Sequence, residues 1–108
     1  MPRATPDAAK AAHTKALRQE AGRWLKAARE AAGLTQAQLS EQVGLRYYTF
    51  VSQVESGVGR LPIETQGAWA KALHLDEAEF AKTLLAYYEP ELHRLLFESD
   101  ASPSRAIA

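Results

Sequence analysis

The sequence contains no cysteine, so the chain can form neither disulfide bonds nor thiolate metal sites. It has no apolar stretch long enough to cross a bilayer, and its first residues lack the apolar run of a secretory signal. The 108 residues fit one compact domain, and apolar residues make up 46% of them, which is enough to form a core. We therefore expect a soluble, cytoplasmic protein that makes no membrane contact.

The chain also lacks net charge, because its 13 basic and 13 acidic residues cancel. At first sight this argues against a nucleic-acid partner, but the charges are unevenly spread. Residues 1–29 have a balance of +5, and residues 76–108 have a balance of −4. Since a polyanion responds to the local field, the basic half could face DNA while the acidic half faces away. Solvated helix faces explain the same pattern equally well, so charge alone does not decide.

Patterns of enzyme chemistry are missing as well. His13, His74 and His93 are isolated and have no metal-ligand spacing, and there is no glycine-rich phosphate loop. His74 stands at the expected end of a helix, where a cation suits the helix dipole. We expect no catalytic residue, no metal, no cofactor and no small-molecule ligand, and hence not an enzyme.

What the sequence does contain is helical periodicity, because apolar residues recur at helical spacing almost throughout and no strand pattern is found. The first helix should begin near Asp7 or Ala11 and end at Ala32, with Gly33 stopping it. The spacing predicts further helices at 36–43, 47–56 and 62–74, a fifth one between Asp76 and Pro90, and a short last one at 91–97.

Local signals mark two helix starts. Thr35 has a side chain that caps helix N-termini, and Gln38, three residues later, is the matching capping-box partner. Asp76 and Glu79 repeat this pattern before the fifth helix. Gly44 should end the second helix. We therefore expect two short helices joined by a glycine turn within residues 35–57, which is a helix-turn-helix unit.

The combination of Arg29, the run Gly-Leu-Thr-Gln at 33–36, Gly44 and Glu55-x-Gly57 is specific. It closely resembles the Cro and phage-repressor-like (XRE) helix-turn-helix family of DNA-binding transcriptional regulators, over residues 20–85. The resemblance implies an all-α fold, namely a five-helix repressor-like domain with a long first helix and a carboxy-terminal helical extension. The expected parts are an N-terminal arm at 1–12, the DNA-binding domain at 13–75, dimerising helices at 76–97 and a disordered tail at 98–108.

The resemblance also implies roles for residues near the start of the second helix. Thr35 and Gln36 would hold a DNA phosphate there, since free backbone amides and the helix dipole favour an anion; the alternative for Gln36 is a plain surface side chain. Arg29 and Glu55 resemble the pair that ties the first helix to the end of the third, which is a structural role that a bidentate contact suits.

Specificity is expected from the third helix, which would enter the major groove of double-stranded DNA. Leaving out Phe50, Val51 and Val54 as core residues gives six candidates for base reading. These are Arg46, Tyr47, Tyr48, Thr49, Ser52 and Gln53.

The segment before the third helix departs from the family pattern. One residue more than the family's usual spacing separates Gly44 from Gly57, and it lies within 45–48. It either lengthens the turn or starts the third helix earlier. For Tyr47 and Tyr48, the alternative to contacting DNA is that a ring packs back on the second helix. Arg60, in the next loop, would contact a phosphate or else be an exposed loop arginine.

The carboxy-terminal segment has more apolar residues than a small five-helix domain needs. We expect a homodimer interface, because two-fold operators require two-fold proteins. The alternative is that the segment folds back on the first helix and completes the monomer core. The interface candidates are Phe80, Leu84, Tyr88, Leu92, Leu95 and Leu96.

These features together predict a homodimeric, sequence-specific transcriptional regulator, with repression by promoter blocking as the simplest mode. Two alternatives stay open. The first is an antitoxin or autoregulator that also binds a partner protein. The second is a helix-turn-helix module that binds proteins and not DNA, which the zero net charge and the two tyrosines favour. Steep salt dependence of duplex binding would separate DNA readers from such a module.

Overall fold

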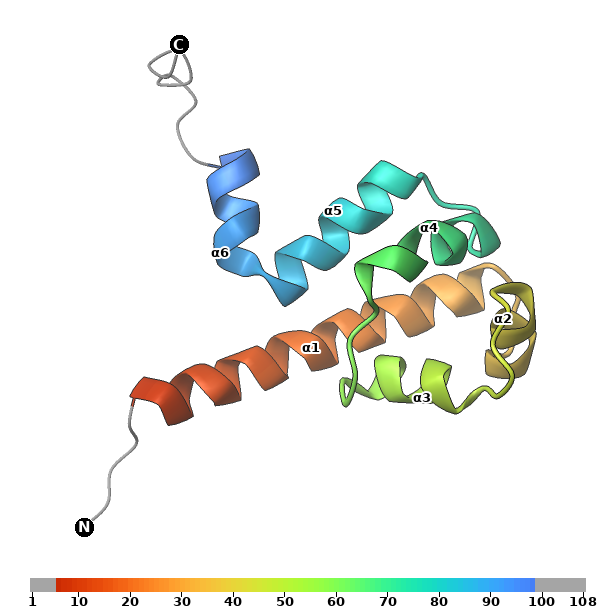
Figure 1. The fold of residues 1–108 in the computed structure, drawn as a ribbon, viewed down its shortest axis with the longest axis horizontal. Helices are drawn as coiled ribbons and strands as arrows, with labels where there is room; N and C mark the ends of the chain where they lie inside the picture. Colours follow the sequence, from red (N-terminus) through yellow and green to blue (C-terminus); the bar gives the residue numbers. More distant parts are fainter. Residues whose placement is uncertain (1–5, 99–108) are drawn as a thin grey trace.

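A computed structural model describes residues 6–98, and this part of the chain is helical without strands (Figure 1). The predicted all-α fold with a helix-turn-helix is confirmed. No helix within the described range is long and apolar enough to cross a membrane. The elements in chain order are α1 (Pro6–Ala31), α2 (Gln36–Gln42), α3 (Thr49–Ser56), α4 (Ile63–Ala72), α5 (Glu77–Tyr88), α6 (Pro90–His93) and a π-helical turn, η1 (Arg94–Glu98).

The chain ends fall partly outside the described residues. The expected N-terminal arm includes helical residues, because α1 already begins at Pro6. Of the tail expected to be disordered, only Glu98 is described, and it belongs to η1; residues 99–108 lie outside the described range, as do residues 1–5.

Local hydrogen bonds fix where the helices start. At α2, the backbone N–H of Gln38 donates to Thr35 Oγ1 (3.0 Å), and the backbone N–H of Thr35 donates to Gln38 Oε1 (2.9 Å), so the predicted capping box is confirmed. At α5, Asp76 Oδ2 accepts from the backbone N–H of Glu79 (3.0 Å). Gly44, after α2, has a φ of 79°, a left-handed conformation that disfavours side chains with a Cβ.

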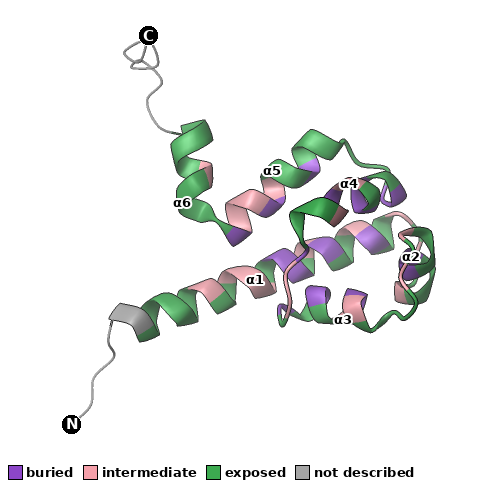
Figure 2. Cartoon of the chain, viewed as in Figure 1, coloured by how far each residue is buried: buried purple, intermediate pink, exposed green. Residues whose placement is uncertain are grey.

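The core forms where α1 packs between α3 and α5 (Figure 2). The rings of Trp24 on α1 and Phe80 on α5 lie 5.6 Å apart, and Phe50 on α3 meets Trp69 on α4 edge-on at 6.4 Å. The largest fully buried side chains are Trp69, Phe80, Leu25, Leu39, Leu61, Leu84, Val51 and Val54.

The carboxy-terminal segment corrects part of the expected dimer interface. Phe80, Leu84 and Tyr88 are buried within one chain, with exposed fractions of 1%, 0% and 7%, so they have no surface left for a second copy. They complete the monomer core, as the alternative interpretation supposed. By contrast, apolar side chains of α6 and η1 are about half exposed: Leu92, Leu95, Leu96 and Phe97.

Candidate nucleic-acid interface

A buried ion pair joins the first helix to the end of the third. Arg29 donates from Nε to Glu55 Oε2 (2.6 Å) and from Nη2 to Glu55 Oε1 (3.0 Å), and both side chains are more than nine-tenths buried. A third donor, Nη1, reaches the carbonyl oxygen of Leu34 at 2.8 Å. The hydrogen bonds with Glu55 raise the pKa of Arg29 despite its burial. The pair therefore holds α1, α3 and the segment before α2 in one arrangement.

The backbones of α1 and α3 approach closely beside this pair. A Cβ on Gly22 of α1 would collide with the carbonyl oxygen of Glu55, and a Cβ on Gly57 would lie 2.7 Å from Gln19 Cγ. Only glycine at both positions allows this spacing. Sequence reasoning missed Gly22, although a glycine inside an alanine-rich helix costs about 1 kcal/mol and therefore indicates a packing reason.

The outer side of α3 presents polar side chains. Thr49 and Gln53 are four residues apart, so they share one helix face, and both are exposed. Ser52 lies at the edge of this face and is partly buried. The opposite face is apolar, with Val51 and Val54 completely buried. The structure thus puts three of the six base-reading candidates on the helix, with Thr49 and Gln53 the best placed.

The turn between α2 and α3 is longer than the sequence predicted. The third helix begins at Thr49, two residues later than the spacing predicted, and Tyr48 is its N-cap without a side-chain hydrogen bond. Arg46, Tyr47 and Tyr48 therefore precede α3, on the turn, and are not part of the helix. At the start of this turn the backbone N–H of Leu45 donates to the carbonyl of Ser40 (2.8 Å), and the Leu45 side chain packs against the core.

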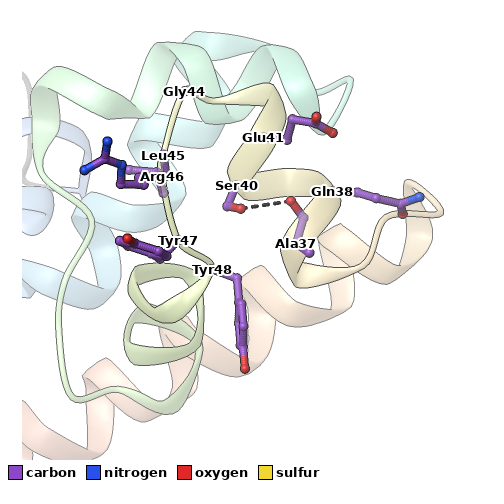
Figure 3. Close-up of a pocket in the computed structure, with 9 residues that line it drawn as sticks. All are labelled: Ala37, Gln38, Ser40, Glu41, Gly44, Leu45, Arg46, Tyr47 and Tyr48. Carbon is purple, nitrogen blue, oxygen red and sulfur yellow. Dashed lines mark hydrogen bonds between the residues drawn. The ribbon is translucent and has the colours of Figure 1, made fainter.

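Both tyrosine rings stand out from this turn (Figure 3). Tyr47 is 68% exposed and Tyr48 55% exposed, so neither is buried against α2. With Arg46 they form one side of an open groove of about 770 Å³, whose other side is α2. The α2 residues that line it include Ala37, Gln38, Ser40 and Glu41. The turn thus exposes two aromatic rings and a cation directly before α3.

The two residues at the start of α2 are partly occupied by internal contacts. Gln36 Nε2 donates to Glu55 Oε1 at 2.9 Å, which makes Gln36 a third member of the Arg29 network. Its amide retains a second N–H. Thr35 accepts a hydrogen bond through Oγ1, as described above, and its hydroxyl hydrogen can still be donated. Both side chains can therefore donate to a phosphate without losing their structural contacts.

Arg60 contacts residues that are distant from it in the sequence, which the sequence analysis did not predict. Its Nη1 pairs with Glu89 Oε2 at 3.0 Å, and its guanidinium lies 4.7 Å from the centre of the Tyr88 ring. The Tyr88 hydroxyl in turn accepts the backbone N–H of Leu61 (3.1 Å), and burial raises the pKa of Tyr88. The loop after α3 is thus fastened to the end of α5. A phosphate would have to use the other guanidinium donors or replace Glu89.

Comparison with known proteins agrees with this geometry. A family model described as a helix-turn-helix domain matches residues 15–82, which is more than half of the chain. No curated protein matches the chain in sequence. The matched range begins within α1 and ends within α5, so it includes the Arg29–Glu55 pair, the long turn and α3. The chain belongs to the helix-turn-helix domain family.

Proposed function

We propose that this protein binds specific double-stranded DNA as a transcriptional regulator of the Cro and phage-repressor (XRE) type, with α3 in the major groove. The observation that carries the proposal is the outward pair Thr49 and Gln53, presented on a helix that Arg29 and Glu55 hold rigidly in place. Glutamine can pair with adenine through two hydrogen bonds, and threonine can meet a thymine methyl group.

Phosphate contacts would orient the domain on the duplex. Thr35 and Gln36 have the donors for this at the start of α2, and Arg46 contributes an exposed cation on the turn. Tyr47 and Tyr48 are exposed beside the same groove, and each has a hydroxyl group that can donate a hydrogen bond to a phosphate. In this assignment the turn, α2 and Arg60 in the loop after α3 contact the phosphate backbone, while α3 reads bases.

The assignment can be tested with duplex fragments selected from a random DNA pool. Thr49→Ala or Gln53→Ala should relax the preference at particular base pairs, at about 1–3 kcal/mol for each lost contact. Arg60→Ala should weaken binding to all sequences about equally. A uniform loss from all three substitutions would contradict the assignment, and binding without any sequence preference would contradict the proposed function.

We further propose that the regulator is a cytoplasmic homodimer that acts as a repressor on a two-fold operator. The exposed apolar side chains of α6 and η1 support the dimer, because neighbouring apolar side chains exposed on a protein surface often mark a site of contact with another protein. Leu92→Asp combined with Leu96→Asp should convert dimers to monomers in sedimentation velocity, with an unchanged circular dichroism spectrum. A folded double variant of unchanged mass would contradict the interface.

The same apolar surface favours a second candidate function, that of an antitoxin or autoregulator that binds a different protein through this surface. The two candidates predict different masses for the unsubstituted protein in solution. A homodimer should show twice the chain mass when purified alone, whereas a regulator that reserves this surface for another protein should be monomeric.

A further inference from the structure

One stripe along α1 faces α3. A Cβ on Gly22 of this stripe would collide with the Glu55 carbonyl, and a Cβ on Gly57 would collide with Gln19, so both α1 residues lie against the end of α3. Lys15 and Lys26 belong to the same stripe, because they lie four residues before Gln19 and four residues after Gly22. Both lysines are exposed. Each is therefore on the α3 side of α1 but not covered by α3.

Lys15 lies beyond one end of the contact with α3, and Lys26 lies alongside that contact, between Gly22 and Arg29, which both meet Glu55. Gln19 already meets Gly57, which directly follows the last residue of α3, so Lys15 lies one turn beyond the end of that helix. Figure 1 shows the N-terminal part of α1 extending past α3, and Figure 2 shows it largely exposed. Lys15 and Lys26 are eleven positions apart along the helix, which corresponds to about 16 Å. They are therefore far enough apart to reach separate anionic groups.

Neither lysine has an ion-pair partner among the side chains that the structure describes, those of residues 8–98. Three arginines of the same range are neutralised instead, by Glu55, Glu89 and Glu91. A lysine without a counter-ion on the α3 side of α1 keeps its charge available to an external anion.

The depth of the major groove brings phosphates to the level of α1. Packed helices lie about 8–10 Å apart, and the groove is about 8.5 Å deep. When α3 lies at the bottom of the groove, the phosphates along the rim therefore stand about as high as the helix packed behind α3. We propose that Lys15 and Lys26 bind phosphates at this rim, so that α1 is part of the DNA-binding surface. The inference rests on the proposed function, because it needs α3 in the groove.

The test is the salt dependence of binding to a selected duplex. Each phosphate contact contributes about 0.9 to the slope of log K against log salt concentration. Lys15→Gln combined with Lys26→Gln should therefore make this negative slope shallower by about 2. The order in which the protein prefers different DNA sequences should stay the same. Lys15→Arg combined with Lys26→Arg should keep the slope of the unsubstituted protein. Glutamine and lysine have similar helix propensities, so all variants should fold.

The control removes the same charge elsewhere. Lys10 lies about 140° around the helix from Lys15, and Lys71 is exposed on α4. Lys10→Gln combined with Lys71→Gln should leave the slope nearly unchanged. An unchanged slope in the Lys15 and Lys26 variant, or an equal change in the control, would overturn the inference while duplex binding itself persists. Absence of sequence-preferring duplex binding in the unsubstituted protein would overturn the proposed function, and this inference with it.

Discussion

Replacing Arg29 by methionine should strongly destabilise the domain. The substitution removes both hydrogen bonds to Glu55 and the one to the Leu34 carbonyl. Glu55 would stay more than nine-tenths buried, with only the Gln36 amide, at 2.9 Å, as a partner. Breaking a buried pair in this way costs about 3–5 kcal/mol. Domains of this size are stable by about 5–15 kcal/mol, so the melting temperature should fall by more than about 10 °C.

Urea unfolding followed by circular dichroism and tryptophan fluorescence measures this loss. The exposed Arg23, on the same helix, gives the control: Arg23→Met should change the free energy of unfolding by less than about 0.5 kcal/mol. Replacing Arg29 and Glu55 together by methionine should cost less than the sum of the single substitutions, by about 2 kcal/mol, because no unpaired charge remains. Additive single effects, or a loss below about 1 kcal/mol for Arg29→Met, would refute the reasoning.

Three further substitutions test the packing. Gly22→Ala should lower the free energy of unfolding by about 1–3 kcal/mol in urea titrations despite the better helix propensity of alanine, because the new Cβ meets backbone; a stabilised variant would contradict this. Gly44→Ala should cost about 1–2 kcal/mol through its φ of 79° alone, since nothing lies within 4 Å of the new Cβ, and Gly44→Asn should cost less. Tyr88→Phe should cost about 1–3 kcal/mol because the backbone N–H of Leu61 loses its acceptor. The pKa of Tyr88 is raised in the folded state. The stability that the neutral Tyr88 hydroxyl contributes to the free energy of unfolding is therefore complete below the unfolded pKa of about 10, and it is lost as the pH rises above that value. Stability curves at increasing alkaline pH should show this loss in the unsubstituted protein and not in Tyr88→Phe.

The sequence predicted best where interactions are local. The capping box of Thr35 and Gln38 spans three residues, and the structure contains both of its hydrogen bonds. The pair of Arg29 and Glu55 is 26 residues apart, yet it was predicted because both residues belong to a motif of specific spacing. The family match covers residues 15–82, which include both partners of this pair.

Positions that depend on tertiary packing were predicted less well. A spacing count predicts an additional residue before the third helix, but it does not tell where the helix begins; the structure has α3 starting at Thr49 and not at Tyr47. Phe80 and Tyr88 have the periodicity of any amphipathic helix, which does not tell whether α1 or a second copy covers them. The contact of Arg60 with Glu89 joins residues 29 positions apart and has no local pattern.

Selection of bound fragments from a random DNA pool, done in parallel with the unsubstituted protein and with Gln53→Ala, tests the central claim most directly. The account predicts that the unsubstituted protein enriches one motif, and that Gln53→Ala loses the preference at one or two positions of each half-site while keeping the rest. Failure of the unsubstituted protein to enrich any motif, or an identical motif for both proteins, would contradict base reading by α3.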